Sequence, residues 1–104
     1  MTLYEIQALV VSVDPEARHY DSAHRDGESY TVWKEGTTLG MMGDGQHMGG
    51  IKFVVHRFTK DEDDATATEL CNALEARDDV SFAYVADYEP ETGYIHHIFD
   101  CEGI

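Results

Sequence analysis

The sequence predicts an α+β fold in one domain of residues 1–104, with a mostly antiparallel sheet of about five strands and one amphipathic helix packed on one face. The segment Ile51–Phe58 alternates its side chains as a strand does, and a helical pattern follows it directly. A single helix cannot cover both faces of a parallel sheet, whereas an antiparallel sheet can keep one face in water. The expected order is strand, strand, an optional short strand, strand, helix, strand, strand.

The first strand is predicted over Leu3–Val13. Alternation would place one set of residues on a single face, namely Tyr4, Ile6, Ala8 and Val10. An Asp-Pro pair follows, and it would end the strand because proline donates no amide to a ladder. The polar residues 16–28 are expected to form a loop or a wide hairpin connection.

The second strand is predicted over Ser29–Glu35, which is rich in β-branched and aromatic residues. The stretch Gly36–Gly50 then holds six glycines in fifteen residues, together with three methionines. It is expected to be a loop, with an optional short strand over Thr38–Met42 before a turn at Gly43–Gly45.

The helix after the central strand has both a start signal and an apolar stripe. Thr59 and Glu62 have the spacing of a capping box, in which each side chain accepts a hydrogen bond from the other residue's amide. The stripe that the helix would bury consists of Ala67, Leu70, Cys71 and Leu74. Four acids of the first turn, Asp61–Asp64, would then lie at the positive end of the helix dipole.

Two more strands are predicted after the helix. Val80–Tyr88 alternates as a strand, and Glu89–Gly93 has the composition of a turn. Tyr94–Asp100 would return as the last strand, and Cys101–Ile104 would form a tail.

The strongest functional signal is the charge. The formal net charge is -14, whereas solubility in a small domain requires a magnitude of only about 2–8. Residues 1–60 hold eight acids and six Lys or Arg, and residues 61–104 hold thirteen acids and one Arg. Such a surface repels nucleic acid and anionic membranes and attracts basic partners.

Composition also restricts the cellular setting. Two cysteines do not make a disulfide framework, so a reduced, cytoplasmic location is expected. The N-terminus lacks the pattern of a signal peptide, and no apolar run is long enough to cross a bilayer.

No catalytic or metal-binding motif accompanies these features, so the chain is not expected to be an enzyme or to need a cofactor. His96 and His97 are neighbours on a predicted strand and would point to opposite faces, so they cannot easily share one ion. Cys71 and Cys101 have apolar or acidic surroundings, which disfavour a reactive thiolate. The glycines of residues 43–50 lack the lysine and helix of a phosphate-binding loop.

We therefore expect the acidic half to be a binding face. Carboxylates on a protein surface can stand in for DNA phosphates and occupy a Lys/Arg groove. The expected partner-binding residues are Asp61, Glu62, Asp63, Asp64, Glu69, Asp78, Asp79, Asp87, Glu89 and Glu91.

A short, acidic, cysteine-poor chain with no active site resembles the phage-encoded inhibitors of host defence, especially anti-CRISPR proteins. The resemblance is one of overall character and rests on the Asp61–Asp64 run and the later acids, with no shared motif. It implies a non-enzymatic blocker of a basic, nucleic-acid-binding partner such as a CRISPR complex, acting in the host cytoplasm.

Two alternatives stay open. A cytoplasmic protein of a salt-loving organism would also be acidic, with a histidine- or metal-dependent role, and three lysines in the whole chain suit that interpretation. A self-associating module, such as a homodimer joined through an exposed strand edge, is the third hypothesis.

Overall fold

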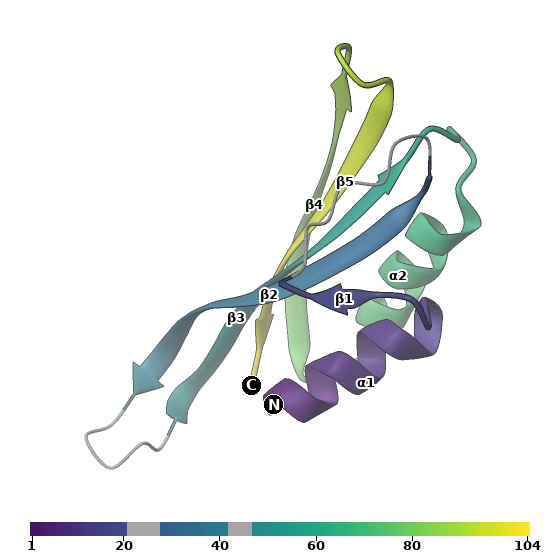
Figure 1. Ribbon diagram of the computed structural model, residues 1–104. Helices are drawn as coiled ribbons and strands as arrows, with labels where there is room; N and C mark the ends of the chain where they lie inside the picture. Colours follow the sequence, from purple (N-terminus) through teal and green to yellow (C-terminus); the bar gives the residue numbers. More distant parts are fainter. Residues whose placement is uncertain (21–27, 42–46) are drawn as a thin grey trace.

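The computed structural model describes residues 1–20, 28–41 and 47–104 (Figure 1). Its elements, in chain order, are α1 (Leu3–Val13), β1 (Arg18–His19), β2 (Tyr30–Met41), β3 (His47–Thr59), α2 (Ala65–Glu75), β4 (Val80–Glu89) and β5 (Tyr94–Gly103). The α+β class is confirmed. No helix in these described ranges is long and apolar enough to cross a membrane.

The five strands form one sheet in the order β1-β2-β3-β5-β4. The short β1 lies within the stretch predicted to hold no strand, and it runs parallel to β2; every other neighbouring pair is antiparallel. The prediction of a mostly antiparallel sheet is therefore confirmed, as are the strands over Val80–Tyr88 and Tyr94–Asp100 and the turn between them.

The prediction of a strand over Leu3–Val13 is wrong, because this segment is helix α1. Thr2 and Glu5 form a complete capping box at its start. Ile6 and Val10, four residues apart, are the buried residues of the helix. The β-branched run at its end favours a strand locally, but burial of the Ile6–Val10 stripe outweighs that preference. The described residues therefore hold two helices, where one was expected.

The predicted start of the second helix is also wrong. Thr59 is fully buried in β3, and its hydroxyl accepts from the amide of Asp61. The true N-cap is Asp64, whose carboxylate accepts from the amide of Ala67 at 2.9 Å. Asp61, Glu62 and Asp63 therefore precede α2 and do not occupy its first turn.

The predicted loop over residues 36–50 and the predicted tail are both shorter than expected. β2 continues to Met41 past irregularities in its pairing, and β3 begins at His47. The proposed turn at residues 43–45 lies outside the described residues. At the other end, β5 extends to Gly103. Gly50 permits this close packing, because its φ is +99° and a side chain there would overlap the Gly103 carbonyl.

Two successive helix–strand–strand units build the domain. α1, β2 and β3 form the first, α2, β4 and β5 form the second, and β3 and β5 meet in the middle of the sheet. Both helices lie on the same face (Figure 1). They bury one core between them and the sheet, made of Ile6, Val10, Trp33, Ile51, Phe53, Val55, Leu70, Leu74, Phe99 and Cys101.

The sheet consequently has a helix-covered face and an open face. In β3, the side chains of Phe53, Val55 and Arg57 are buried under the helices. The alternate residues, among them His56 and Phe58, are only half-buried on the opposite side. This alternation decides which chemical groups remain available to a partner.

Candidate functional site

The ten predicted binding residues fall into four places. Six lie at the end of the sheet where β3 ends and β5 begins, and we call them the acidic end: Asp61, Glu62, Asp63, Asp87, Glu89 and Glu91. Glu69 is exposed on α2, and Asp64 lies inside an ion-pair cluster. Asp78 and Asp79 lie at the opposite end, where β4 begins beside the end of β5.

Tertiary structure brings the two segments of the acidic end together. The loop of residues 60–64 leaves β3 at Thr59, and Thr59 pairs with Ile95 directly after the β4–β5 turn. The Lys60 ammonium lies 5.1 Å from the centre of the Tyr94 ring, so the loop rests against the turn end of the β4–β5 hairpin. Figure 1 shows this loop and the hairpin tip at the same end of the molecule. Most of these carboxylates are exposed to solvent.

Asp64 has a structural role and is not free for a partner. Its two oxygens accept from the Arg57 guanidinium at 2.9 and 3.1 Å, and Asp14 lies 3.4 Å from the same group. Burial alone would raise the pKa of Asp64, but the hydrogen bonds from Arg57 and from the Ala67 amide hold it below its ordinary value. The carboxylate therefore stays ionised and secures the start of α2.

Asp79 is likewise engaged within the chain. The Arg77 guanidinium donates two hydrogen bonds to its carboxylate, at 2.9 and 2.8 Å, and these hydrogen bonds lower its pKa. Because Asp78 and Asp79 lie a sheet length away from the acidic end, the ten residues do not form one continuous face.

The open face carries a group of stacked rings that the sequence reasoning did not identify. Phe58 stacks on Tyr30 and on His96, with ring centres 4.7 and 4.1 Å apart. His56 Nδ1 lies 2.8 Å from His96 Nε2. Burial, with the neighbouring His96 and Lys34, lowers the pKa of His56 to about 4, so this histidine is neutral at pH 7. Only the strand register reveals this cluster, since its members come from three strands.

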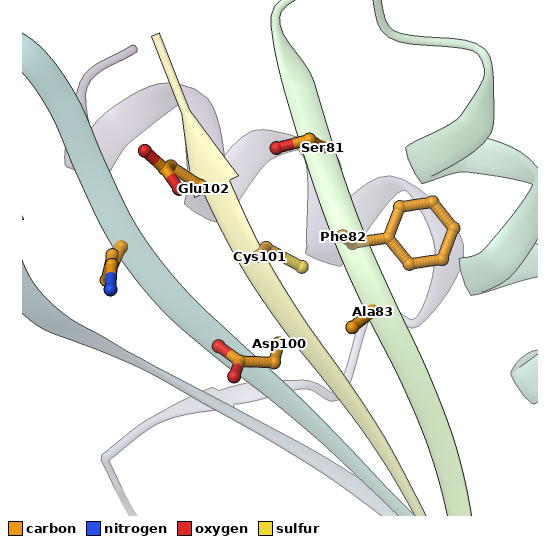
Figure 2. A pocket seen from close by; sticks show the side chains of 7 residues that line it. Ser81, Phe82, Ala83, Asp100, Cys101 and Glu102 are labelled. Carbon is orange, nitrogen blue, oxygen red and sulfur yellow. The ribbon is translucent and has the colours of Figure 1, made fainter.

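A hollow of about 260 Å³ lies farther along the open face (Figure 2). Figure 2 shows Ser81, Ala83, Asp100 and Glu102 on one side of β4 and β5, while Phe82 points away from them toward the helices. Lys52, which pairs with Glu102 across the strands, also lines the hollow. The hollow is therefore lined by one lysine and two carboxylates, those of Asp100 and Glu102.

A second cavity, of about 290 Å³, lies between α2 and strands β4 and β5 on the helix-covered side. His97 and Tyr84 form part of its wall, and the Tyr84 hydroxyl lies 2.6 Å from His97 Nδ1. His97 therefore faces the helices while His96 faces the open side, as their adjacency on a strand predicts.

The two cysteines lack the surroundings of a nucleophile. Burial, with Asp100 nearby, raises the pKa of the Cys101 thiol to about 12. Burial and Glu75 also raise the pKa of Cys71. Both thiols are free, and no group of three or more His, Cys, Asp or Glu side chains in the described residues is arranged to hold a metal ion.

No family model, curated protein or solved structure matches this chain. Function must therefore be argued from the chain's own geometry.

Proposed function

We propose that this protein is a non-enzymatic acidic binding protein that occupies a basic surface of a nucleic-acid-binding protein. The observation that carries the proposal is the acidic end itself. Two acidic segments more than twenty residues apart in sequence converge at one end of the sheet, where most of their carboxylates face solvent.

Asp61 accepts from the Asp63 amide and Glu89 accepts from the Thr92 hydroxyl, but contacts of this kind do not account for all carboxylates of the acidic end. Asp64 caps α2 and pairs with Arg57, so its presence follows from the fold. Asp63 and Glu91, in contrast, are exposed, and neither caps a helix. Adjacent like charges repel each other, so such a cluster favours a partner that supplies cations.

The narrower form of the proposal is an anti-CRISPR-like inhibitor. A groove that binds nucleic acid uses Lys and Arg side chains against phosphates, and the exposed carboxylates of the acidic end would compete for the same side chains. The partner would then be a CRISPR effector, and the protein would act in the cytoplasm of the host.

The test measures displacement of labelled target DNA from guide-loaded CRISPR effector complexes. Fluorescence anisotropy of the labelled DNA reports the displacement. We expect the wild-type protein to displace DNA, and to do so less effectively as salt rises, because screening weakens the charge contacts. A triple variant should displace DNA at least tenfold less effectively while it stays folded. It carries Asp63→Lys, Asp87→Lys and Glu91→Lys.

The matched control reverses three other exposed acids, Glu16→Lys, Asp78→Lys and Asp100→Lys. It changes the net charge by the same amount but leaves the acidic end intact. Equal losses for both variants would show that bulk charge attracts the partner, and no displacement by the wild-type protein from any effector would remove the narrower proposal.

A further inference from the structure

The cavity beneath α2 has the lining of a site for a cation. Its polar wall groups are Glu62, Asp64, Thr68, Asn72, Tyr84 and His97, and no lysine or arginine lines it. The adjoining cluster contains one guanidinium, that of Arg57, and two carboxylates, so it leaves one negative charge in excess. Its volume of about 290 Å³ is below the roughly 300–1,000 Å³ of small-molecule sites, and suits a single long side chain.

His97 provides an independent sign that a ligand group belongs there. Its side chain is only 8% exposed, and Nε2 has no hydrogen-bond partner in the described part of the chain. Buried polar atoms in proteins are nearly always paired. In the tautomer that carries its proton on Nδ1, His97 donates to the Tyr84 oxygen, and Nε2 has a lone pair that can accept an N–H from a ligand.

Strand β4 lies beside this cavity and offers an unpaired edge. It is the outer strand of the sheet, and in the described ranges it pairs only with β5. Tyr84, Val85 and Tyr88 on this strand are 48%, 55% and 61% exposed. An outer strand with exposed apolar residues is a template on which an extended segment can add as a further strand.

We propose that an extended basic segment of the partner adds to the edge of β4 and places one arginine side chain in the cavity beneath α2. The inference rests on the proposed function, since it assigns a mode of contact to the same basic partner. Directly opposed side chains of paired strands lie about 4.5–5.5 Å apart, so a residue opposite Tyr84 would stand at the cavity wall. Its guanidinium would meet Glu62 and the face of the Tyr84 ring.

The charges along β4 complement such a segment. Asp87 projects from the open side of the strand and pairs in register with His96, while Glu89 and Glu91 follow at the turn. Basic residues of the added strand that point to the open side would therefore also meet carboxylates. Strand β4 of a second copy contains no lysine or arginine to meet these carboxylates, which disfavours a second copy as the occupant.

The experiment uses a capped nine-residue peptide of alternating arginine and threonine, titrated into the full-length protein by calorimetry and by amide chemical-shift mapping. Binding should shift amides of β4 and of the first half of α2. Citrulline in place of every arginine, which keeps the shape and removes the charge, should weaken binding at least tenfold. Equal binding of both peptides would overturn the inference.

The cavity is tested by Asn72→Leu, which fills it from an exposed position on α2, with Ala65→Leu as the control outside it. We expect the first variant to bind the arginine peptide at least tenfold more weakly and the second to bind it with unchanged affinity. Unchanged affinity in Asn72→Leu would show that the cavity receives no side chain.

Strand addition is tested on the peptide, so that the protein's own fold is untouched. Two peptides carry N-methyl groups on alternate amides, in the two opposite phases. Because alternate amides of a strand face the same neighbour, one phase should abolish binding and the other should retain it. Retention in both phases, or loss in both, would contradict pairing with β4.

The two proposals fail separately. If the peptide does not bind but the Asp63, Asp87, Glu91 reversal still abolishes DNA displacement, the proposed function stands and this mode of contact is wrong. If the peptide binds as described but no effector is affected, the edge site stands and the narrower, anti-CRISPR form of the proposed function is wrong.

Discussion

The two faces of β3 show how one strand can serve both the fold and a surface. On the covered side, Phe53 and Val55 are fully buried beneath both helices, and Arg57 is nearly so. On the open side, His56 and Phe58 are half-buried and join rings from neighbouring strands. Packing therefore specifies the covered residues closely, whereas the open residues are free to serve recognition.

The largest expected effect comes from Arg57 on the covered side. Arg57→Met leaves the carboxylates of Asp14 and Asp64 without their shared cation, and breaking a buried pair costs about 3–5 kcal/mol. Urea unfolding would measure the change in the free energy of unfolding. Lys52→Met, on the open side of the same strand, is the control and should stay within about 0.5 kcal/mol. Similar losses of stability in both variants would show that the two faces of β3 do not differ in this way.

Core leucines should follow in size. Leu74→Ala removes a side chain that is 2% exposed, and such truncations cost about 2–5 kcal/mol. Val85→Ala, on the exposed edge strand, should change the free energy of unfolding by only about 0.5 kcal/mol. Thermal and urea unfolding of both variants would check this, and an unchanged curve for Leu74→Ala would mean that α2 packs differently.

The histidines of both faces should make the protein less stable in acid. Burial lowers the pKa values of His56, His96 and His97, so the unfolded chain binds their protons more readily than the folded one. For His56 the loss of stability should therefore begin as pH falls through about 6.5 and level off near pH 4. A further loss, from Asp64, should begin below its ordinary value of 3.8.

Urea unfolding between pH 8 and pH 4 would measure this slope. His56→Gln should flatten it more than His96→Gln does, because His56 alone among these three histidines has its pKa lowered as far as about 4. If the His56→Gln variant shows the same pH dependence of stability as the wild-type protein, the lowered pKa of His56 is contradicted.

The smallest expected effect is that of salt on the fold. The acidic end lies outside the core, so removing salt should lower the melting temperature only modestly. Circular dichroism at about 10 mM and about 1 M salt would test it, ionic strengths at which screening differs strongly. Unfolding below molar salt would favour the salt-adapted alternative over a dedicated binding face.

The sequence by itself determined much of the second half of the chain. The alternation in residues 51–58 and 80–88 and the turn at 89–93 are local patterns, and the strands lie where these patterns predict. Ala67, Leu70 and Leu74 are buried as the helical stripe predicts, since a period of 3.6 residues specifies one face. The excess of acid after residue 60 is also a property of the sequence alone.

Tertiary structure alone decided the identity of the first element and the true start of the second helix. The spacing Thr-x-x-Glu occurs at both Thr2 and Thr59, but only the first forms a capping box. Thr59 lies in β3, where it pairs with Ile95, and Arg57 holds Asp64 at the start of α2. Strand pairing and buried ion pairs join residues distant in sequence, so no local pattern contains them. The same reason explains why the acidic end, the ring cluster and the cavity emerge only when the chain is folded.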